Sequence, residues 1–94
     1  MDKDKLIDEA HQLAKACSRK EVAQQIKPAF SYLIYHRDLG QFKTFLQTKS
    51  ASKRSDRHWE EAREHLKKLL EKGYSVDELL FIMGIAIRLM GYYH

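Results

Sequence analysis

The chain has 94 residues, of which 44% are hydrophobic and 32% charged, and its formal net charge is +4. This length and composition exclude several domains and a disordered chain, and the single cysteine, Cys17, excludes an internal disulfide. The start of the chain lacks the apolar core of a secretory signal, and the longest apolar run is shorter than the about 20 residues that cross a bilayer. We expect one domain over residues 1–94 in the cytoplasm, without a membrane partner, and the positive charge favours an anionic partner such as nucleic acid.

Two amphipathic helices are predicted in the first part of the chain. The first is capped by Asp2 or Asp4. Its apolar stripe repeats at three and four residues and consists of Leu6, Ala10, Leu13 and Cys17. Ser18 and Glu21 then form a capping box, and a second apolar period continues through Pro28. Because proline removes a backbone donor and crowds the preceding turn, this segment is either one kinked helix or two closely abutted helices.

A short third helix and a loop are predicted next. Asp38 followed by Gln41 is a variant of the same capping signature, and Gly40 offers a turn out of the preceding helix. The apolar patch of this helix consists of Phe42, Phe45 and Leu46. Residues 48–56 have no apolar period and are rich in serine and basic residues, which predicts a loop.

A fourth helix follows the loop. Ser55 or Asp56 caps it, and glycine at position 73 ends it, as glycine does just after a helix. Its core-facing residues are Trp59, Ala62, Leu66, Leu69 and Leu70.

The last stretch, Ser75 to Tyr93, begins with a capping box formed by Ser75 and Glu78. The following residues, Leu79 to Ile87, are apolar with only Gly84 between them, so they point all round a helix. Such a helix is normally buried on every side. We therefore expect an all-α, compact bundle of about five helices around a hydrophobic C-terminal helix. A chain this short does not cover such a helix fully, which predicts self-association or a stable protein partner.

Six basic residues on and around the predicted loop are the strongest functional feature. They are Arg37, Lys43, Lys49, Lys53, Arg54 and Arg57. Lysine and arginine on a serine-rich loop suit phosphate contacts that do not read the base sequence. The alternative is a solvated loop whose charge only keeps the protein in solution.

The chain offers no specific catalytic or metal-binding motif. His58, Glu61 and His65 share one helix face at a spacing that metal ligands use. No second helix supplies the matching carboxylate and histidine that a metal-binding bundle requires. We therefore expect no metal site, no cofactor and no catalytic residue, and we do not expect an enzyme.

Arg88 and His94 provide one alternative. Their spacing resembles the catalytic arginine–histidine motif of the helical ribonucleases of the HEPN class. In that family a polar residue normally follows the arginine, whereas Leu89 follows it here. A simpler interpretation is that Arg88 places a cation near the negative end of the helix dipole.

Two stretches resemble the small α-helical subunit of class 1 CRISPR effector complexes, mainly of the type III kind. In Ile26–Gln47 a lysine–proline helix runs into a glycine-led turn and a second helix, and Met90–His94 closes an apolar helix with an aromatic–histidine pair. The resemblance implies a non-enzymatic subunit of which several copies stack head to tail. It also implies a basic face that follows the guide–target nucleic acid without reading its sequence.

The sequence thus favours a non-catalytic subunit that binds single-stranded RNA or DNA, or a guide–target duplex, and that contacts other protein subunits. The alternatives are a small helical adaptor or homodimer without a nucleic-acid role, and the HEPN-like ribonuclease.

Overall fold

Five α-helices and no strand make up the part of the chain that the structure describes. This computed structural model describes residues 2–17, 19–50 and 57–93, except for the side chains at positions 49, 50, 92 and 93. The helices are α1 (Lys3–Ala16), α2 (Lys20–His36), α3 (Leu39–Ser50), α4 (Arg57–Glu71) and α5 (Val76–Tyr93). The predicted all-α bundle of about five helices is therefore confirmed.

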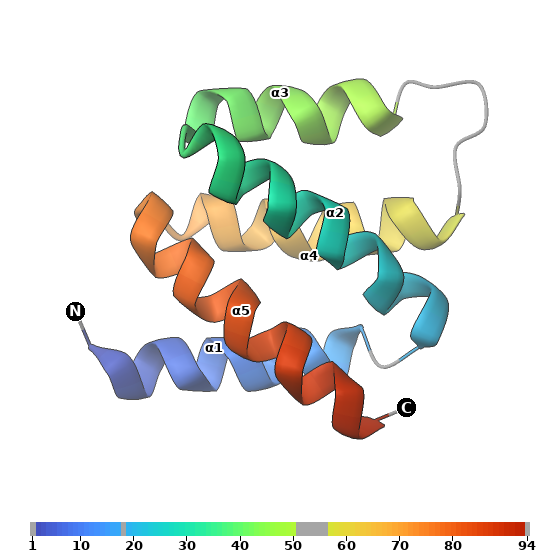
Figure 1. The fold of residues 1–94 in the computed structure, drawn as a ribbon, viewed down its shortest axis with the longest axis vertical. Helices are drawn as coiled ribbons and strands as arrows, with labels where there is room; N and C mark the ends of the chain where they lie inside the picture. The colour runs from blue at the N-terminus through green and yellow to red at the C-terminus, as the bar shows by residue number, and fades with distance from the viewer. Residues whose placement is uncertain (1, 18, 51–56, 94) are drawn as a thin grey trace.

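The helices are arranged around α2 and the C-terminal helix α5, which contact each other. In Figure 1, α2 and α5 run antiparallel across the front of the bundle, and α4 lies behind α2. Helix α2 packs against α3, α4 and α5, whereas the main contacts of α5 are with α1 and α2. The radius of gyration, 12.4 Å, is that of a compact globular chain of this length.

The structure corrects the expectation that the last helix is enclosed on every side. Its fully buried side chains form one stripe, consisting of Leu79, Ile82, Met83, Ala86 and Met90. The other apolar side chains that are described on α5 are half-buried, and Arg88 is exposed. A run of apolar residues shows that a helix can be buried on any face, but the number of neighbouring helices decides how many faces are covered. No helix in the described ranges is both long and apolar enough to cross a membrane.

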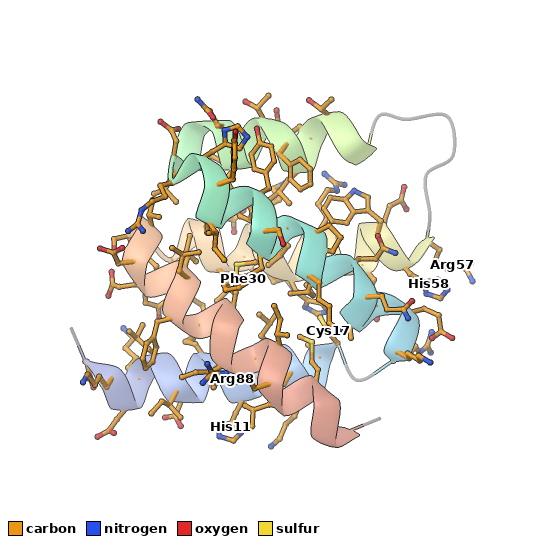
Figure 2. All side chains as sticks on the ribbon, in the orientation of Figure 1. His11, Cys17, Phe30, Arg57, His58 and Arg88 are labelled. Atoms are coloured by element: carbon orange, nitrogen blue, oxygen red, sulfur yellow. The ribbon has the colours of Figure 1, made fainter. Side chains whose placement is uncertain are left out.

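A close approach of α2 and α5 helps to fix their packing. Figure 2 shows Phe30 of α2 lying between the two helices. A methyl group added at Gly84 would lie 3.6 Å from the nearest carbon of the Phe30 ring. Glycine is therefore not strictly required at this position, because 3.6 Å is an ordinary van der Waals distance.

The first half of the chain confirms the predicted cap of α1 and resolves the alternatives at Pro28. The Asp2 side chain accepts a hydrogen bond from the backbone N–H of Lys5, as an N-cap does. The partner proposed for Glu21, Ser18, lies outside the described residues. Helix α2 is one continuous helix with exposed Pro28 inside it, so the segment is not two helices.

The turn between α2 and α3 differs from the expected one. Arg37, and not Gly40, takes the left-handed backbone conformation, with φ of 50°. Its N–H donates to the carbonyl of Leu33, which ends α2. Asp38 then caps α3 by accepting from the N–H of Gln41. Helix α3 continues to Ser50, so the first three residues of the predicted loop are helical, and the caps proposed at 55 and 56 lie outside the described ranges.

The connection between α4 and α5 forms as predicted. Gly73 has a φ of 81°, which glycine adopts without strain. The capping box is reciprocal, because Ser75 N–H donates to the Glu78 carboxylate and Glu78 N–H donates to the Ser75 hydroxyl.

Candidate nucleic-acid interface

A groove of about 250 Å³ lies between α3 and α4. Its lining comes from the middle of α3 and the second half of α4 and consists of Lys43, Leu46, Gln47, Arg63, Lys67, Leu70 and Glu71. The two leucines give it an apolar floor, and the other side chains are polar or charged. The groove can therefore hold a ligand that is partly apolar and partly charged.

The charges of the groove are predominantly positive. Lys43, Arg63 and Lys67 line it from both helices, and Glu71 is the one carboxylate among its lining residues. Cations that converge on a concave surface raise the local concentration of anions. The groove therefore favours an anionic ligand.

Arg63 is the most buried of these cations. Its Nε atom is buried and has no hydrogen-bond partner among the described residues. One terminal nitrogen lies 3.6 Å from a carboxylate oxygen of Glu64, which is a loose ion pair with a half-exposed partner. A buried donor without an acceptor costs about 1–3 kcal/mol, so part of the hydrogen-bonding capacity of Arg63 is unused in the wall of the groove.

The packing of α3 and α4 places the basic side chains on the flanks that line the groove. In α3, Phe42 and Leu46 are buried, so the residue after Phe42, Lys43, points to the flank of the helix. In α4, Leu66 and Leu69 are buried in the same way, which leaves Lys67 and half-buried Leu70 on the flank that faces α3. The two flanks meet because α3 and α4 are in contact.

Two of the predicted binding residues lie close to these elements. Lys43 lines the groove and is exposed. Arg37 lies at the end of α2, where its guanidinium forms an ion pair with Asp77 in the first turn of α5. The charge of Arg37 is thus already offset by a carboxylate, which weakens its attraction for phosphate.

The other predicted residues are not brought to the groove by described contacts. Arg57 is exposed at the first position of α4, at the edge of the molecule in Figure 2. The end of α2 and the start of α4 lie at opposite ends of the bundle, so Arg37 and Arg57 do not share one site (Figure 1). Lys53, Arg54 and the side chain of Lys49 lie outside the described residues. The six-residue basic set therefore stays a prediction as a whole.

Sequence reasoning missed Arg63 and Lys67. Both lie on one flank of α4, four residues apart, and Leu70 and Glu71 continue the same stripe. Lys43 and Gln47 have the same spacing on α3. These two polar stripes are visible in the sequence, but their meeting depends on which flank of α3 packs beside α4.

A second pocket, of about 150 Å³, lies between α1 and the end of α4. Its lining includes Glu9, His65, Lys68 and Lys72. The carboxylate of Glu9 is bound by the Lys72 ammonium, so this pocket has less free charge than the groove. No group of three potential metal ligands gathers anywhere in the described ranges, and this includes the His58, Glu61 and His65 face.

The residues of the ribonuclease alternative are only partly placed. Arg88 is exposed on α5, near the point where this helix crosses α1 in Figure 2. His94 lies outside the described residues.

Comparisons with protein-family models, with curated proteins and with solved structures return no match to this chain.

Proposed function

We propose that this protein is a non-catalytic helical subunit that binds nucleic acid through phosphate contacts in the groove between α3 and α4. The observation that supports it most is the convergence of Lys43, Arg63 and Lys67 on one concave surface with a single lining carboxylate. Lysine and arginine that neutralise phosphates release counterions, and this release supplies binding energy that does not depend on base sequence.

The groove also contains neutral contacts that suit a polynucleotide. Gln47 adds an amide to the charged groups, and half-buried Leu70 supplies apolar surface for a sugar or a base edge. Single-stranded RNA or DNA fits such a surface, and a guide–target duplex would meet it through its backbone.

We further propose that the protein acts as the small subunit of a CRISPR ribonucleoprotein complex of the type III kind, with several copies along one nucleic acid. The five-helix architecture and the basic groove support this role. The half-buried apolar residues of α5 provide surface for a neighbouring subunit.

The binding proposal is tested by fluorescence anisotropy with labelled single-stranded RNA, single-stranded DNA and a duplex. Lys43→Ala combined with Lys67→Ala should weaken binding of all three. The matched control is Lys3→Ala combined with Lys15→Ala, which removes two exposed lysines from α1, on the side of the bundle opposite α3 (Figure 1). Equal affinities of the two double variants would contradict a role for the groove.

The assembly proposal is tested by sedimentation velocity with oligonucleotides of increasing length. A subunit that stacks along nucleic acid should add copies as the oligonucleotide lengthens. A complex that keeps one stoichiometry at every length contradicts the stacking arrangement but leaves the groove as a binding site.

The second candidate is a helical adaptor or homodimer without a nucleic-acid role. It is favoured by Ile34 and Tyr35, which are adjacent, large and exposed on α2. A stable dimer that binds no oligonucleotide in the anisotropy titration would select this candidate.

A further inference from the structure

A row of aromatic rings crosses the bundle from the surface to the core. The Tyr32 ring stacks on Phe45 of α3, with centroids 4.3 Å apart and an interplanar angle of 16°. The Tyr32 ring also meets the His36 ring, with centroids 4.1 Å apart, and His36 meets Tyr35 edge to face, with centroids 5.0 Å apart. Phe45 in turn contacts Trp59 of α4 at 5.9 Å. These five residues are called the aromatic row below.

The inner end of the aromatic row is anchored in the core. Trp59 is 1% exposed, and Phe45 is half-buried and packed against the core cluster. Stacked and edge-to-face ring pairs each contribute about 0.5–1.5 kcal/mol beyond their buried area. These contacts favour one orientation of Tyr32 and His36, and a preorganised surface loses less conformational entropy on binding.

The outer end of the aromatic row is open to solvent. Tyr35 is 83% exposed, and Ile34 beside it, at 47%, is the other exposed large hydrophobic side chain among the described residues. His36 is exposed as well. Among the described residues, the other large apolar side chains are buried or half-buried, whereas α2 presents a tyrosine and a histidine side by side.

The surroundings of Tyr35 are polar and basic. Ser31 and Lys27, one and two turns earlier on the same face of α2, are exposed, and Lys27 lies about 12 Å from Tyr35 along the helix. Arg37 follows at the end of the helix, but Asp77 offsets its charge, so Lys27 supplies the positive charge for a phosphate. An interface between two proteins typically needs about 800 Å² on each partner with an apolar centre, whereas the apolar exposure here is confined to two neighbouring residues. An exposed ring on the same surface as a lysine is an arrangement with which proteins hold unpaired bases.

We infer that the exposed end of the aromatic row, Tyr35 with His36, is a stacking platform for unpaired bases of a single-stranded nucleic acid. This inference rests on the proposed function and adds the substrate class, because bases inside a duplex cannot stack on a protein ring. Tyr32 and Phe45 position the stacking platform. Lys27 lies on the same face of α2, where it can contact the phosphate backbone of the bound strand.

The test uses two oligonucleotides of equal length, one single-stranded with all its bases and one abasic, so that both carry the same phosphates. Anisotropy titrations compare the wild type with Tyr35→Ala, Tyr35→Trp and Ile34→Ala. Tyr35→Ala should weaken binding of the intact strand by about 10-fold, a loss in the range for one stacked base, and leave the abasic strand unchanged. Tyr35→Trp keeps an aromatic ring and should retain the affinity for the intact strand. Ile34→Ala removes exposed apolar surface but no aromatic ring, so it should change this affinity little.

Each other outcome overturns the inference in a distinguishable way. If Tyr35→Ala binds the intact strand as tightly as the wild type, the inferred stacking platform is contradicted, while the proposed groove is unaffected. If the wild type binds neither oligonucleotide, both proposals fall. If Tyr35→Ala and Ile34→Ala instead dissociate a wild-type dimer in sedimentation velocity, with oligonucleotide binding unchanged, the surface is a contact between two copies of the chain. Because Tyr35 is largely exposed, its variants should keep the wild-type melting temperature, which circular dichroism checks.

Discussion

The ammonium nitrogen of Lys72 lies 2.8 Å from both carboxylate oxygens of Glu9. Glu9 is the one buried charged residue among those described, and Lys72 is the residue after α4. The pair joins α1 to the turn that leads into α5, although the two residues are 63 positions apart in the chain. It therefore ties α1 to the end of α4.

Breaking this pair should destabilise the fold. Lys72→Met leaves the Glu9 carboxylate buried without its partner, and we expect the free energy of unfolding in urea to fall by about 1–2 kcal/mol, since Lys72 itself is partly solvated. Lys68→Met is the matched control, because Lys68 lines the same pocket but is exposed, and it should change stability by less than about 0.5 kcal/mol. Equal effects of the two substitutions would show that the pair contributes nothing.

Replacing two of the glycines by alanine should change the free energy of unfolding in opposite directions. Gly84→Ala should stabilise the protein by about 0.5–1 kcal/mol, because alanine favours a helix interior and its methyl group meets Phe30 at an ordinary contact distance. Gly73→Ala should destabilise it by about 1 kcal/mol, since φ is 81° there, although nothing crowds the added atom. Urea unfolding of both variants measures this, and a loss of stability in Gly84→Ala would contradict the packing described for α2 and α5.

The capping box of α5 should make stability depend on pH. The hydrogen bond from the Ser75 backbone N–H lowers the pKa of Glu78 below its ordinary value of 4.5, and a hydrogen bond with the Ser75 side chain contributes further. A carboxyl group whose pKa is lower in the folded state than in the unfolded state stabilises the fold at pH values above the unfolded pKa, here 4.5. This stabilisation is lost as the pH falls below 4.5 and through the folded pKa. Glu78→Gln cannot titrate, so its melting temperature should fall less steeply with acidification than that of the wild type. Parallel curves would rule out this contribution.

Ser75→Ala removes the other half of the same box. It should lower the free energy of unfolding by about 1 kcal/mol at neutral pH, because the Glu78 N–H loses its acceptor. Thermal melts followed by circular dichroism measure the change, and Ser31→Ala, an exposed serine within α2, is the control that should stay close to the wild type.

Cys17 should be inert while the protein is folded. Burial, followed by the negative charge of Glu61, raises the pKa of this thiol to about 12. The thiolate is the reactive form, so iodoacetamide at neutral pH should leave the native protein unmodified and label it after denaturation. Equal labelling rates in both states would mean that the end of α1 opens readily.

The helices were predictable because their signals are local. Caps such as Asp2 and Ser75 and the apolar repeats lie within a few residues, so they can be read without knowing the neighbours. The turn at Arg37 was misplaced to Gly40 because glycine is the usual left-handed residue, whereas here an arginine adopts that conformation and forms an ion pair with Asp77. That pair connects residues 40 positions apart, and no local pattern signals it.

The candidate site was harder to predict than the fold. Lys43 was recognised from its charge, but Arg63 and Lys67 join it only because α3 and α4 pack with those flanks together. The aromatic row has the same origin, since Tyr32, Phe45 and Trp59 come from three helices. For α5, the sequence indicated which residues can be buried, but not that only α1 and α2 would be its main neighbours.

The salt dependence of binding tests the central claim, that the groove neutralises phosphates. For a single strand, the logarithm of the affinity falls with the logarithm of the salt concentration by about 0.7 for each phosphate contact, so Lys43→Ala with Lys67→Ala should make the slope shallower by about 1.4. The control that removes Lys3 and Lys15 has the same net charge and should keep the wild-type slope. If the groove variant also keeps that slope and its affinity at low salt, the groove does not bind nucleic acid.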